Sequence, residues 1–156
     1  MEMNTDFTTH KQLAIDLFNL TWDLIEKQDR TEIDDDTMLY AAMSSRYHWG
    51  LVGTPLNFAR GEWQISRVYA ILGRSEAALH HARKSEKLCR EHDLGEFDLG
   101  FAYEAIARAY ALSGDAADQE RYMNLALETA EKVETEANRS WLLKNIHSVS
   151  SGFIPV

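Results

Sequence analysis

A chain of 156 residues, 45% of them hydrophobic, is long enough to bury the core of one domain, which we expect to span residues 1–156. A formal net charge of −9 excludes the lysine and arginine excess that nucleic acids and anionic membranes attract, so neither is expected as a partner. One cysteine cannot form an intramolecular disulfide, and no apolar run is long enough to span a bilayer. These features predict a cytoplasmic protein.

Apolar residues recur at helical spacing throughout, and only two prolines and eight glycines interrupt them, so an all-α fold is predicted. Any of Asp34, Asp35 and Asp36 could cap the second helix, which should stop at Gly50. In chain order, helices are expected at about 9–27, 34–49, 55–73, 75–92, 97–113, 115–132 and 135–148.

The first expected helix is amphipathic. Its apolar stripe consists of leucines separated by four, three and four residues, and polar residues occupy the opposite, solvent-facing side. The leucines are Leu13, Leu17, Leu20 and Leu24. Phe18, Trp22 and Ile25 lie beside this stripe.

Residues 65–73 return as residues 106–114, an offset of 41 residues with five of the nine positions identical. A period of this size indicates stacked supersecondary units, none of which can bury its apolar face alone. Each copy contains a tyrosine four residues before a glycine, Tyr69 before Gly73 and Tyr110 before Gly114. The small residues Ser66, Ala70 and Ala107 accompany them, and Ala78 and Ala126 follow on the expected partner helices.

With these residues the chain resembles the tetratricopeptide repeats, with a period of 41 residues instead of the usual 34. The resemblance implies a right-handed array of antiparallel helical hairpins with about seven helices. It places a degenerate hairpin at about 9–50, repeats at about 55–93 and 96–132, a capping helix at about 135–148 and an apolar tail at 149–156. It also implies that the first helix of each hairpin lines a concave groove that binds a protein or peptide.

The repeat register places six residues in that groove, in two rows that each follow one helical face. They are Arg60, Trp63 and Arg67 from the third helix, and Phe101, Glu104 and Arg108 from the fifth. Two arginines at equivalent positions could hold a carboxylate of a partner, with Trp63 packing on its apolar groups. Alternatively, Glu104 pairs with Arg108 four residues away, or with Arg67 to join the hairpins. We expect a non-enzymatic binding or scaffolding module.

The alternative is a small enzyme or small-molecule binder that uses polar groups of the same groove. Its candidate residues are His48, Glu62, Arg67, Glu104 and Arg108. The six histidines show no metal-ligand spacing, so neither a metal nor a cofactor is expected, although a site assembled from His48, His81 and Glu62 stays open. No catalytic residues are assigned.

Two further expectations concern surfaces. A short array often covers leftover apolar surface by self-association, so a homodimer is predicted, with Trp49 and Trp141 as interface candidates. The tail ends in Phe153-Ile154-Pro155-Val156, and proline prevents it from being helical. An extended segment with Phe153 or Ile154 in an apolar cleft is therefore expected.

Overall fold

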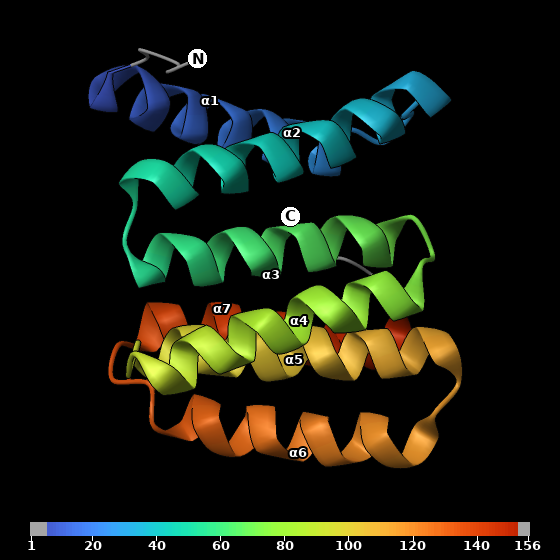
Figure 1. The fold of residues 1–156 in the computed structure, drawn as a ribbon. Coiled ribbons are helices and arrows are strands. Elements are labelled where there is room, and N and C mark those ends of the chain that lie inside the picture. The colour runs from blue at the N-terminus through green and yellow to red at the C-terminus, as the bar shows by residue number, and fades with distance from the viewer. Residues whose placement is uncertain (1–5, 153–156) are drawn as a thin grey trace.

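The computed structural model describes residues 6–152, which form seven α-helices and no strand (Figure 1). Three antiparallel hairpins follow one another, α1 with α2, α3 with α4 and α5 with α6, and α7 packs on α5 and α6. The predicted all-α array of helical hairpins is confirmed. None of the described helices is both long and apolar enough to cross a bilayer. The helices are α1 (Phe7–Glu26), α2 (Glu32–Val52), α3 (Pro55–Ile71), α4 (Ser75–Glu91), α5 (Glu96–Ser113), α6 (Ala116–Glu131) and α7 (Glu136–Ser151).

Both ends of α2 differ from the prediction. Thr31, not an aspartate, caps the helix: its hydroxyl accepts from the Asp34 N–H at 3.1 Å, and the Asp34 carboxylate accepts from the Thr31 N–H at 3.0 Å. The helix also continues through Gly50 to Val52. A Cβ at Gly50 would lie 3.2 Å from the Arg46 guanidinium, so the missing side chain leaves room for Arg46 on this turn.

The C-terminal helix is longer than expected. α7 continues to Ser151, so the tail does not begin at residue 149 as predicted. Phe153 and Ile154, which we expected to dock in an apolar cleft, lie outside the described residues.

Small residues bring the helices of each hairpin close together. The buried Ser45 hydroxyl of α2 donates to the Ala14 carbonyl of α1 at 2.8 Å. In the next hairpin, the Ser85 hydroxyl of α4 donates to the Ala59 carbonyl of α3 at 2.9 Å. A hydroxyl can reach the backbone of a neighbouring helix only where two helices approach closely, so these bonds mark close contacts between the paired helices.

The two repeated tyrosines make equivalent contacts. Tyr69 stacks on His81 of α4, with ring centroids 5.6 Å apart. Tyr110 stacks on Tyr122 of α6 at 5.8 Å. Because His81 and Tyr122 are themselves 41 residues apart, the repeat includes both helices of a hairpin.

The repeated glycines end the helices as the sequence predicts. Gly73 and Gly114 adopt φ values of 74° and 80°, in the left-handed region that residues with a Cβ rarely adopt. In each case the residue after the glycine donates its N–H to the carbonyl of the repeated tyrosine, at 2.9 and 3.1 Å. The chain can therefore reverse directly into the partner helix.

Candidate functional site

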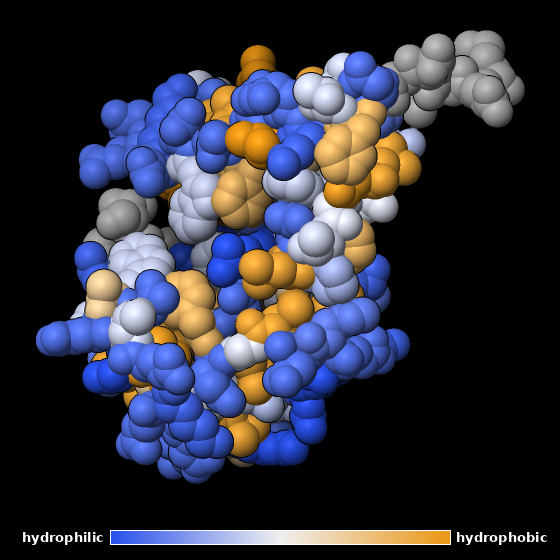
Figure 2. All heavy atoms as spheres, turned by 90° about the vertical axis from the view of Figure 1, so that its left-hand side faces the viewer, coloured by the Kyte–Doolittle hydropathy of each residue, from blue (hydrophilic) through white to orange (hydrophobic). Residues whose placement is uncertain are grey.

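α1, α3, α5 and α7, with Ser85 of α4, line an aromatic pocket of about 140 Å³. Three of the four tryptophans of the chain line it. Figure 2 views the molecule from the end at which α3, α5 and α7 begin, and shows pale and orange side chains between hydrophilic regions above and below. The pocket is lined by Phe18, Trp22, Ala59, Arg60, Trp63, Ser85, Phe97, Asp98, Phe101 and Trp141.

The aromatic rings of the pocket pack in a continuous row. The Trp63 ring lies 5.8 Å from that of Trp22 on α1 and 5.4 Å from that of Phe101 on α5, with the latter pair edge to face. Phe97 meets Phe101 edge to face at 5.0 Å. Edge-to-face contacts are a favoured geometry for aromatic pairs, so they help to hold Trp63, Phe101 and Phe97 in this row.

An ion pair lies among these rings. The Arg60 guanidinium donates two hydrogen bonds to the Asp98 carboxylate, at 2.8 and 3.1 Å. These bonds to Asp98 raise the pKa of Arg60, against the effect of burial. The Arg60 side chain is 49% exposed, so part of the pair still faces water. The pocket therefore combines apolar walls with one charged group on each of α3 and α5.

Beside the pocket, Arg67 and Arg108 share one carboxylate, as one of the two alternatives from the sequence requires. Glu104 accepts from Arg67 Nη2 at 3.0 Å and from Arg108 Nε at 2.8 Å. All three side chains are buried, with Glu104 only 1% exposed. We call Arg67, Glu104 and Arg108 the buried arginine cluster.

The last helix completes this cluster. Arg67 also donates to the side-chain oxygen of Asn145 at 3.1 Å, and Arg108 donates to the Ser148 hydroxyl at 2.6 Å. Burial lowers the pKa of Arg67 to about 10, and the Glu104 charge opposes this change. The Nη1 atom of Arg67 has no hydrogen-bond partner among the described residues. Two guanidinium groups thus face one carboxylate in a buried environment.

The six predicted groove residues separate into two adjoining groups. Arg60, Trp63 and Phe101 line the pocket. The other three form the buried arginine cluster, which Trp63 joins to the pocket: its indole N–H donates to Glu104 at 3.3 Å, and the Arg67 guanidinium lies 4.8 Å from its ring. Their role in binding a partner stays a prediction.

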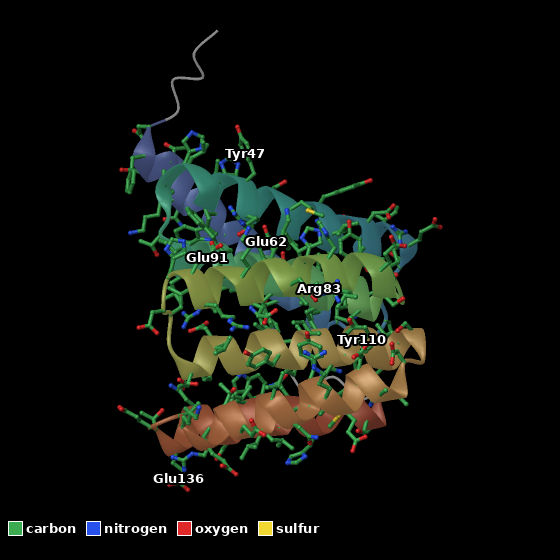
Figure 3. All side chains as sticks on the ribbon, turned by 60° about the horizontal axis from the view of Figure 1, so that its bottom comes forward. Tyr47, Glu62, Arg83, Glu91, Tyr110 and Glu136 are labelled. Carbon is green, nitrogen blue, oxygen red and sulfur yellow. The ribbon has the colours of Figure 1, made fainter. Side chains whose placement is uncertain are left out.

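The candidates for the enzymatic alternative do not gather in one place. His48 lies in the first hairpin, where its Nδ1 is 2.9 Å from Nδ1 of His10. Glu62 belongs to a cluster between α2 and α4 (Figure 3), where it accepts from Arg46 at 3.2 Å and lies 2.7 Å from His81 Nδ1. Among residues 6–152, no three side chains of histidine, cysteine, aspartate or glutamate are grouped to hold a metal ion.

The Glu62 cluster and the His10–His48 pair differ in which charge state the fold favours. Burial raises the pKa of Glu62, but the His81 hydrogen bond and the charges of His81, Arg46 and Lys84 outweigh it, so the pKa is lowered. Burial and the charge of His10 lower the pKa of His48. A carboxylate held against an imidazole orients that ring, which is the part of an acid–base site that this cluster provides.

Sequence reasoning missed Phe18, Trp22, Phe97 and Asp98 as pocket residues, and Trp141 was assigned to a dimer interface. A signal was present: Trp22, Trp63, Glu104 and Asn145 follow one another at intervals of 41 residues. They stand at equivalent places on α1, α3, α5 and α7, and each is in contact with the pocket or the buried arginine cluster. α7 therefore occupies the position of the first helix of a fourth hairpin.

Comparisons with models of protein families, with curated proteins and with solved structures found no match to this chain. Its function must therefore be inferred from the geometry of the pocket and its surroundings.

Proposed function

We propose that this protein is a non-enzymatic binding module that holds a peptide segment of a partner protein by one aromatic or branched apolar side chain. The observation that carries the proposal is the aromatic pocket between α1, α3, α5 and α7. Pockets that anchor a ligand are mostly apolar with a few placed polar groups, and here the Arg60–Asp98 pair supplies them.

The size of the pocket favours one ring or one branched side chain. A cavity of roughly 150 Å³ in another protein accommodates benzene, and this pocket has a volume of about 140 Å³. Arg60, half exposed, is in a position to bond the backbone carbonyls of the same peptide while remaining paired with Asp98. Burial of one anchor side chain in such a pocket is the usual source of a binding hot spot.

The resemblance to tetratricopeptide repeats supports the same proposal, since the first helices of successive hairpins line the pocket.

The buried Cys89 bears on where the protein is located. Burial raises the pKa of its thiol to about 12, which suits a protein of the reducing cytoplasm, and we propose the cytoplasm as its location. A homodimer through Trp49 and Trp141 stays a prediction, and Trp141 would then be shared between that interface and the pocket.

The proposal is tested by selecting binders from a phage-displayed library of random peptides. We expect the selected peptides to share one aromatic or leucine position, and their binding to change the tryptophan fluorescence, because three tryptophans line the pocket. Phe97→Ala should weaken binding of a labelled peptide by about tenfold or more, the loss expected of a hot-spot contact.

The matched control is Trp49→Ala, which removes a half-buried aromatic side chain away from the pocket. Circular dichroism and urea unfolding should show that both variants remain folded. The proposal is wrong if no peptide with an apolar anchor is selected, or if Phe97→Ala and Trp49→Ala weaken binding equally.

A further inference from the structure

α1 carries an apolar row on the side opposite to the pocket. The residues that α1 buries are His10, Ala14, Thr21 and Ile25. The leucines of the predicted stripe follow another line, about a quarter turn around the helix. Leu13 and Leu20 are 39% and 38% exposed, whereas Leu17 and Leu24 are half-buried and Leu24 packs against the core beside Ile25. Leu20 and the pocket residue Trp22 are two positions apart and therefore point in nearly opposite directions.

α2 carries an exposed apolar row of its own. Ile33, Tyr40 and Tyr47 are 76%, 66% and 54% exposed. They recur every seven residues, which is about two helical turns, so they form a line along the helix. Leu51, 51% exposed, extends it by one turn. In Figure 3, Tyr47 lies on the outer side of the first hairpin, away from α3 to α7.

Among residues 6–152 the first hairpin is the first of the array, and no described helix covers its outer side (Figure 1). Repeat arrays normally end in a polar surface, because an apolar end would be exposed to water. Scattered apolar residues need no explanation, but two rows at regular helical spacing on adjoining helices do. The leucines of α1, separated by four, three and four residues, have the a/d spacing with which one helix packs against another.

Charge determines which helix fits. Residues 7–52 contain eight acidic and four basic side chains. Three of these basic side chains already form ion pairs: Lys27 with Asp34, Arg30 with Asp35 and Arg46 with Glu62. The acidic side chains beside the leucine row include Asp16 and Asp23, which are exposed.

We propose that the outer side of α1 and α2 is a second interaction surface, which binds an amphipathic helix with leucine-type residues at a/d spacing and lysine or arginine on its flanks. Opposite charges across an interface favour encounter and fix the register. A second copy of this chain would bring the same acidic flanks together, and like charges facing each other oppose association. The surface is independent of the aromatic pocket, so one protein could connect two partners.

The test uses a labelled synthetic helix with leucine at each a and d position and lysine at the flanking e and g positions. Fluorescence anisotropy should show binding that weakens as salt is added. The double variant Leu13→Glu with Leu20→Glu should bind at least about tenfold more weakly. Leu112→Glu, at a 45% exposed leucine of α5, is the matched control and should bind like the original protein.

A charge-reversed pair sharpens the test. Asp16→Lys with Asp23→Lys should lose the lysine-flanked helix and gain a glutamate-flanked one. The proposal is overturned if the original protein does not bind the lysine-flanked helix, or if Leu112→Glu weakens binding as much as the double leucine variant. It is also overturned if sedimentation shows a dimer that Leu13→Glu with Leu20→Glu abolishes, because a second copy then covers this surface.

Discussion

Two buried glutamates, one on α5 and one on α3, are held by different kinds of partner. Glu104 lies between two arginines and the indole of Trp63. Glu62 lies between one arginine and one histidine. Even with its pKa lowered to about 10, Arg67 keeps its charge near neutral pH, where histidine side chains in general change theirs. The first cluster therefore pairs its carboxylate with arginines alone, whereas the second pairs a carboxylate of lowered pKa with an arginine and a histidine.

The largest effect is expected at Glu104. Glu104→Gln leaves two buried guanidinium groups without a counter-charge, and breaking a buried ion pair in this way costs about 3–5 kcal/mol. Urea unfolding at neutral pH measures the free energy of unfolding. Glu62→Gln, where only the half-buried Arg46 loses a permanent ion pair, is the comparison and should cost less. Equal losses in the two variants would contradict the distinction between the clusters.

A smaller loss is expected at Arg67, on the other side of the same ion pair. Arg67→Met removes the guanidinium that lacks a partner at Nη1 and leaves Glu104 paired with Arg108. The lost bonds to Glu104 and Asn145 should cost about 2 kcal/mol, partly offset because methionine needs no solvation in a buried site. If Arg67→Met destabilises the protein as much as Glu104→Gln, the buried excess of positive charge is not what makes Glu104 necessary.

The cluster around Glu62 should show its effect in acid. Because the pKa of Glu62 is lowered in the folded protein, the carboxylate stabilises the fold above its unfolded pKa of about 4.5, and this stabilisation is lost as the pH falls through the folded pKa. Glu62→Gln should therefore flatten the acid side of the stability curve. Glu120→Gln, at an exposed position of α6, should leave that side unchanged.

Much of the fold could be predicted because its signals are local. Gly73 and Gly114 terminate their helices by a backbone conformation that the residue type itself favours, so the sequence located both turns. The leucine row of α1 could not be placed in the same way. Hydrophobic periodicity shows that a helix has an apolar side, but not whether a neighbouring helix covers it. In the structure Leu13 and Leu20 are exposed, although their spacing resembles that of a core stripe.

The site was predicted in part for a similar reason. The repeat between residues 65–73 and 106–114 identified Trp63, Arg67 and Arg108 as members of one inner side. It did not identify Trp22 or Asn145, because the residue type changes from one repeat to the next while the position is kept. The sequence left open whether Glu104 pairs with one arginine or with both, since that depends on side-chain directions from α3 and α5.

The smallest effect concerns His48, which is expected to make the first hairpin sensitive to mild acid. The Nδ1 atoms of His10 and His48 are 2.9 Å apart, so one ring must donate and the other must accept. The lowered pKa of His48 means that the unfolded chain takes up a proton at this ring first as the pH falls below about 6.5. Stability should therefore decrease from about pH 7 towards pH 5, before the carboxylates titrate. Urea midpoints measured across this range should change less in His48→Gln, whereas the exposed control His147→Gln should behave like the original protein. An unchanged pH dependence in His48→Gln would show that the histidine pair contributes nothing to it.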